Sequence, residues 1–99
     1  MIHVIAILKA KTGMREALIS HVQENIPAVL AEEGCIEYRP LIDFTSENGG
    51  FGPDTLVMVE KWRDEQCLKN HAATAHMQRY RELVKEIIAE RDIRILRDI

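Results

Sequence analysis

The stretch from Glu60 to Met77 carries the residues best suited to do chemistry. It contains His71, whose imidazole can accept and return a proton close to neutral pH. We interpret His71 as a candidate general base. The alternative is a helix residue whose imidazole is satisfied by a neighbour in the core, and the sequence leaves both interpretations open.

Glu60 and Trp62 lie two residues apart in a run with strand character, so their side chains share one face of that strand. A buried carboxylate would need a partner, and the candidates are Arg39, Arg94 and His71. Otherwise Glu60 forms a salt bridge at the rim of the fold. The Trp62 indole could form the wall of a flat pocket or simply fill the core.

Patterns for metal, phosphate and disulfide sites are missing. His71 and His76 are five residues apart, whereas neighbouring ligands on one helix are about three or four apart. The glycines of 49–52 lie in a loop and not directly after the first strand, so they predict a turn and not a phosphate cradle. Cys35 and Cys67 show neither zinc-ligand spacing nor a disulfide framework. We therefore expect no metal and no nucleotide cofactor.

Apolar patterning predicts four strands that would position these residues. The expected strands cover residues 2–8, 35–44, 55–62 and 92–99. Pro40 indicates an edge position or a bulge for the second strand. Within that strand Tyr38 and Arg39 point to opposite faces, so at most one of them can enter a pocket.

Two helical regions are expected between the strands. The first begins near Met14 with Thr12 as a candidate N-cap, kinks or restarts at Pro27, and closes at Gly34. Its apolar stripe would consist of Leu18, Val22, Ile26, Val29 and Leu30. The second begins after Asp64 as N-cap, and a further segment is capped by Thr74. Its apolar stripe would include Met77, Tyr80, Val84 and Ile87 or Ile88.

The order strand, helix, strand, strand, helix, strand is typical of the ferredoxin-like α+β fold. Both helical regions then cover one face of a single antiparallel sheet. The strands at 2–8 and 55–62 are apolar on both faces. The uncovered face would exceed the roughly few hundred Å² of apolar patch usual for a monomer. We therefore expect a homodimer with two-fold symmetry.

The composition fits one small domain spanning residues 1–99. The chain has 13 basic and 16 acidic residues and a formal charge of −3. This balance lacks the basic face that nucleic-acid binding requires. The apolar N-terminus has no basic flank or cleavage site and is too short to span a bilayer. We expect a cytoplasmic protein without nucleic-acid or membrane partners.

Taken together, the motifs resemble the antibiotic biosynthesis monooxygenase family, in particular its YgiN-type quinol monooxygenases. The motifs that carry the resemblance are Glu60-x-Trp62, Leu68-x-x-His71, Thr74-x-His76, Glu32-Glu33-Gly34-Cys35 with Tyr38, and Arg94-Ile95-Leu96. The resemblance implies a dimeric α/β barrel and an oxygenation that uses O2 without metal, flavin or nicotinamide.

On this resemblance we expect a cofactor-independent monooxygenase or oxidase acting on a quinol or polyphenol. His71, Trp62 and Glu60 would be its catalytic residues. The substrate-binding residues would be Tyr38, Arg39, Met58, Met77 and Arg94. Haem degradation is disfavoured because the first strand lacks the asparagine of the haem-degrading relatives.

Two other classes of function remain open. One is a non-catalytic dimeric module that holds an aromatic metabolite or acts in a stress response. The other is an isomerase of a small phosphorylated sugar-like compound, which would need cations such as Arg39 and Arg94 to converge on the pocket. Oxygen consumption on adding a quinol would separate the oxygenase from both.

Overall fold

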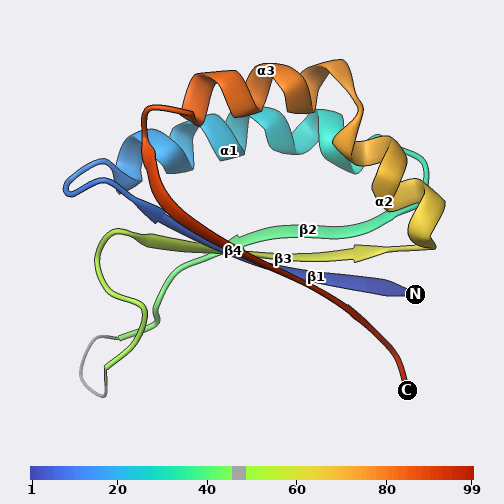
Figure 1. Ribbon diagram of the computed structural model, residues 1–99, viewed down its shortest axis with the longest axis horizontal. Helices are drawn as coiled ribbons and strands as arrows, with labels where there is room; N and C mark the ends of the chain where they lie inside the picture. Colours follow the sequence, from blue (N-terminus) through green and yellow to red (C-terminus); the bar gives the residue numbers. More distant parts are fainter. Residues whose placement is uncertain (46–48) are drawn as a thin grey trace.

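A computed structural model describes residues 1–45 and 49–99 of the chain. Its elements in chain order are β1 (Ile2–Ala10), α1 (Arg15–Leu30), β2 (Cys35–Leu41), β3 (Thr55–Trp62), α2 (Glu65–Ala72), α3 (Ala75–Val84) and β4 (Ile88–Arg97). The strands form one antiparallel sheet in the order β2-β3-β1-β4, and the helices lie together on one side of it (Figure 1). This is the predicted ferredoxin-like α+β fold.

The core lies between this sheet and the helices. Alternate residues of the two central strands point into it, among them Val4, Ala6, Leu56 and Met58. The residues between them, such as Ile5 and Val57, belong to the face that has no helices and are only half-buried. The sheet is therefore apolar on both faces, as the sequence predicts, and only one face is covered.

Helix α1 differs from the expectation in detail. It runs as one helix through Pro27, whose missing N–H falls near the helix end, and it begins after Met14 without a side-chain cap from Thr12. Leu30 is 51% exposed and does not belong to the buried stripe. Asn25 is buried instead, because α3 packs there and its Met77 sulfur accepts a hydrogen bond from the Asn25 amide at 3.3 Å.

The ends of two strands were predicted wrongly. β2 stops at Leu41, which is its last residue paired with β3. The chain then turns, because the Asp43 carboxylate accepts hydrogen bonds from the N–H groups of Phe51 and Gly52. These hydrogen bonds occupy amides of the glycine-rich segment. Residues 46–48 of the same predicted loop lie outside the described part of the chain.

β4 begins four residues earlier than predicted and ends at Arg97. The reason is that β1 extends to Ala10 and provides a pairing partner for Ile88. β2 is an edge strand with a bulge near its start, and it contains Pro40, as the sequence indicates. Across residues 1–45 and 49–99, no helix is long and apolar enough to span a membrane.

Candidate functional site

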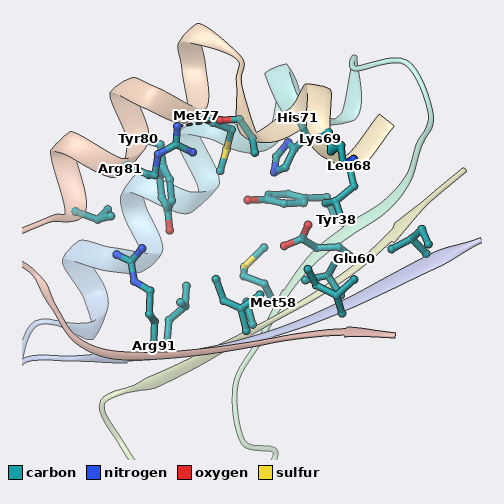
Figure 2. A pocket seen from close by; sticks show the side chains of 18 of the residues that line it. Tyr38, Met58, Glu60, Leu68, Lys69, His71, Met77, Tyr80, Arg81 and Arg91 are labelled. Atoms are coloured by element: carbon teal, nitrogen blue, oxygen red, sulfur yellow. Dashed lines mark hydrogen bonds between the residues drawn. The ribbon is translucent and has the colours of Figure 1, made fainter. Parts of the chain in front are cut away.

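A cavity of about 490 Å³ opens between the helices and the covered face of the sheet. Apolar side chains from β1, β4, α2 and α3 form most of its wall, and the volume suits a small organic ligand. Polar and charged groups enter at separate points, and Figure 2 labels Tyr38, Glu60, Lys69, His71, Tyr80, Arg81 and Arg91. Glu65 also lines the cavity.

His71 reaches the cavity from the last turn of α2. Asp64 fixes the start of this helix directly after β3, because its carboxylate accepts the Cys67 N–H at 2.9 Å. His71 is 5% exposed and packs on the Trp62 indole at 4.5 Å between ring centroids. The Tyr38 ring meets it edge-on at 5.6 Å. The imidazole is thus held between two aromatic rings at the cavity wall.

A hydrogen bond to Nδ1, on the side of the ring away from the cavity, fixes the orientation of His71. Its Nδ1 lies 2.8 Å from Oε2 of Glu32. An ionised carboxylate only accepts hydrogen bonds, so Nδ1 carries the hydrogen, and in the neutral imidazole Nε2 keeps the lone pair. Nε2 makes no hydrogen bond to any residue in the described part of the chain. The arrangement leaves it able to take a proton from a ligand in the cavity.

The turn after α1 brings Glu32 to this position. Gly34 adopts a φ of +82°, and a Cβ there would collide with the Cys67 sulfur. The turn can therefore lie directly against α2 only with glycine at this position. Its approach is also held by a hydrogen bond of 2.8 Å from the Arg63 N–H to the Gly34 carbonyl.

Glu32 also contacts His76, whose Nε2 lies 2.7 Å from the same Oε2 atom. Among the described residues these three side chains are the ones that could hold a metal ion. Two atoms bound to one tetrahedral zinc would lie roughly 3.3 Å apart, given Zn–N and Zn–O distances near 2.0–2.1 Å. The shorter separations of 2.7 and 2.8 Å fit charge-assisted hydrogen bonds.

Glu60 finds its partner on its own strand. The Trp62 indole N–H donates to Glu60 Oε1 at 3.0 Å, so its hydrogen-bond donor is none of the three candidates Arg39, Arg94 and His71. Glu60 is buried, and among the described residues it forms no salt bridge at the rim. Burial raises the pKa of Glu60, while the indole donor and the nearby His71 act to lower it. Glu60 lines the cavity, whereas Trp62 is fully buried beneath His71 and forms no part of the wall.

Two tyrosines stand at different ends of the cavity. Burial raises the pKa of Tyr38, and the Glu60 carboxylate adds to this effect. Burial also raises the pKa of Tyr80 to about 12, against the opposing charge of Arg91. Both hydroxyls therefore stay protonated at neutral pH and can donate hydrogen bonds to a ligand. Figure 2 shows Tyr80 and Arg91 at the end away from His71 and Glu60.

A comparison with protein families identifies the chain. The sequence model described as antibiotic biosynthesis monooxygenase matches residues 1–83. The chain belongs to this family. "Probable quinol monooxygenase YgiN" of Escherichia coli (strain K12) is 37% identical, over 97% of this chain and 96% of that protein. "Putative monooxygenase YcnE" of Bacillus subtilis (strain 168) is 36% identical, over 90% and 87%.

Solved structures agree with the fold. The crystal structure of PA3566 from Pseudomonas aeruginosa superposes with a TM-score of 0.85 at 26% identity, covering 99% of this chain and 93% of that one. The chain therefore shares its fold with that protein over nearly its whole length.

The structure brings five of the eight predicted site residues of this family member to the cavity wall: Tyr38, Met58, Glu60, His71 and Met77. Arg39 and Arg94 do not reach it. They stand in one row with Val59 and Ile5, at opposite edges of the sheet's uncovered face. Arg94 is held there by Asp92 at 2.8 Å.

Sequence reasoning missed several residues of the site, among them Glu32, Tyr80 and Arg91. Glu32 follows a helix in a turn, where no periodicity marks it, although it belongs to the Glu32-Glu33-Gly34 motif. Tyr80 was predicted only as part of an apolar stripe. Arg91 lies in the part of β4 that the sequence did not predict, and alternation with Ile93 would have placed it on the cavity side.

Proposed function

We propose that this chain is a cofactor-independent monooxygenase or oxidase that uses O2 to oxidise a quinol or polyphenol. The observation that supports it most is His71, with Nε2 free and Tyr38 and Glu60 beside it, at one end of a 490 Å³ apolar cavity. The printed name of the Escherichia coli relative points to the same substrate class.

In the proposed mechanism the flat substrate lies between α3 and the face of the sheet that the helices cover. His71 Nε2 accepts a hydroxyl proton from the quinol, and the resulting anion donates electrons to O2. Two electrons and two protons passed to O2 give a quinone and H2O2. If one oxygen atom enters the ring, the products are a hydroxyquinone and water. The protein supplies binding, deprotonation and exclusion of water.

The phospho-sugar isomerase would need cations that converge on the cavity. Arg39 and Arg94, the candidates for this role, lie on the other face of the sheet. Among the described residues, the cations that line the cavity are instead Lys69, Arg81 and Arg91. A non-catalytic aromatic-binding module would use the same cavity without needing His71 as a base. Turnover therefore separates this module from the enzyme.

We also infer that the protein acts as a homodimer joined through the uncovered face of the sheet. Ile5, Ile7, Val57 and Val59 form the apolar centre of that face. A second copy placed there would leave the cavity, on the other side of the sheet, to each protomer.

The test is oxygen uptake after adding a naphthohydroquinone, corrected for its spontaneous oxidation. We expect turnover by the purified chain that is unchanged by EDTA. His71→Ala should remain folded and lose roughly 100-fold or more of the rate, the usual scale for a positioned proton acceptor. His3→Ala is the matched control, since His3 pairs with Asp98 at the surface. No uptake by the folded wild type, or a fully active His71→Ala, would refute the proposal.

A further inference from the structure

The burial of His71 limits how its imidazole can exchange protons with solvent. The side chain is 6% exposed, and a ligand in the cavity would cover Nε2, the atom that takes the proton. With Nε2 covered, any change in the charge of His71 has to be compensated through the other ring nitrogen. On that side lies Nδ1, whose partner is Glu32.

One oxygen of Glu32 serves two imidazoles. Oε2 accepts from His71 Nδ1 at 2.8 Å and from His76 Nε2 at 2.7 Å, and the Glu32 side chain is only 10% exposed. A single buried carboxylate balances one positive charge, because a second imidazolium at the same atom would remain uncompensated. The other groups that face His71 are Tyr38 of β2 and Glu60 of β3. Oε2 of Glu32 is therefore the atom that links the two imidazoles.

His76 connects this cluster to a second space. A polar recess of about 60 Å³, with room for water, lies between residues of α1 and α3. It is lined by His21, Glu24, Asn25, His76, Arg79, Tyr80 and Leu83. His21 Nδ1 is buried with no hydrogen-bond partner among the described residues, which is a further reason for water to occupy this recess.

We propose that Glu32 and His76 are positioning residues that couple proton uptake by His71 to proton release from His76 into this recess. The inference rests on the proposed function, because it takes His71 as the base. At rest His76 is the imidazolium and His71 is neutral with its hydrogen on Nδ1. Both N–H groups that point at Glu32 stay in place throughout.

The transfer balances for one proton and moves no electron. A hydroxyl proton of the substrate passes to His71 Nε2, which makes His71 the cation. The Nδ1 proton of His76 passes to water in the recess, which makes His76 neutral. When reduced oxygen takes up a proton later in the cycle, His71 supplies it and His76 regains one from water. The cluster thus keeps the same net charge while the substrate anion exists.

The experiment uses anaerobic binding of a naphthol, which cannot be turned over, in weakly buffered solution. Phenolate absorbance reports the proton taken by His71, and a pH indicator reports the proton released to solvent. We expect about one proton released for each phenolate formed by the wild type. His76→Gln should still form phenolate, but release should fall at least five-fold because the proton stays on His71. His76→Asn is the second variant, should the first fail to fold.

Two matched pairs of variants separate the positioning role from general damage. Glu32→Gln should abolish phenolate formation, whereas Glu33→Gln, beside it but 82% exposed, should behave like the wild type. His3→Gln should also release one proton per phenolate. A folded His76→Gln protein that still releases one proton per phenolate would overturn the coupling.

Further outcomes distinguish this inference from the proposed function. Phenolate formation with coupled release, but no oxygen uptake with a quinol, would refute the oxidation and leave the coupling standing. Absence of phenolate in the wild type would overturn the coupling, whatever the oxygen uptake. Titration with Zn²⁺ covers the remaining alternative: stoichiometric binding that Glu32→Gln removes would assign the cluster to a metal and refute the coupling.

Discussion

Glu60 is a carboxylate that the fold keeps almost out of water, with the Trp62 indole N–H as its hydrogen-bond donor. Burial disfavours its charged form, which is why its pKa lies above the ordinary value of 4.5. The folded protein therefore holds this proton more tightly than the unfolded chain does. The ionised Glu60 carboxylate therefore lowers the free energy of unfolding at neutral pH.

Glu60→Gln should consequently raise the free energy of unfolding at neutral pH, on the order of 1 kcal/mol, since its amide oxygen can still accept from Trp62. The gain should shrink as the pH falls through the raised pKa of the folded state, and it should vanish below about 4.5, where the carboxyl is protonated in both the folded and the unfolded chain. Urea unfolding at several pH values measures the difference. Glu86→Gln, at an exposed site, is the control. A gain that does not vary with pH would contradict this account.

Sequence reasoning predicted the positions of some residues and misplaced or missed others. It predicted that His71 and Glu60 would face a pocket, because their types and positions on a strand–helix unit are informative, and both line the cavity. It could not tell which face of the sheet the helices cover, so Arg39 and Arg94 were assigned to a cavity they do not reach. Glu32 acts through a contact with a residue 39 positions away, which no local pattern encodes.

The junction of α2 and α3 is the element on which the cluster depends. Thr74 lies between the two helices, and its hydroxyl donates to the His71 carbonyl at 2.9 Å and accepts from the Met77 N–H at 3.3 Å. One side chain thus closes the end of α2 and caps the start of α3. His71 and His76 lie on either side of this junction.

Thr74→Ala should lower stability by about 1 kcal/mol, the usual cost of losing an N-cap. Thr74→Ser keeps the hydroxyl and should stay close to the wild type. Thermal unfolding followed by circular dichroism compares them. Equal losses in the alanine and serine variants would show that the methyl group, and not the cap, is responsible.

Elements were predictable where their signals are local. Asp64 and Thr74 cap the helices that they were expected to cap, and β3 has the bounds that alternation predicts. Ends that depend on pairing were not predictable. β2 and β4 stop or start where β3 and β1 offer partners, and this register is set by contacts distant in sequence.

At the scale of the whole molecule, the main feature is the apolar face of the sheet that no helix covers. Val57 and Met58 are neighbours on β3, but Val57 lies on that face and Met58 is 2% exposed under the helices. A charge at these two positions should therefore have different consequences. The first would meet a second copy, and the second would meet the core.

Val57→Asp should give a folded monomer of 11.4 kDa, whereas the wild type should sediment as a dimer. Met58→Asp should unfold or aggregate the chain. Analytical ultracentrifugation with circular dichroism separates the two results. A monomeric wild type, or a Val57→Asp variant that remains a stable dimer, would rule out this face as the interface.

The two edges of the sheet have a consequence for aggregation. An unprotected edge strand invites further strands to pair with it and grow a ribbon. Here one edge carries a bulge and Pro40, which lacks an N–H, and the other presents alternating charges such as Asp92 and Arg94. Strand addition is discouraged at both edges, and in the proposed dimer the apolar face is covered by a single partner copy. The chain is thus protected against open-ended polymerisation, even though half of its sheet is uncovered.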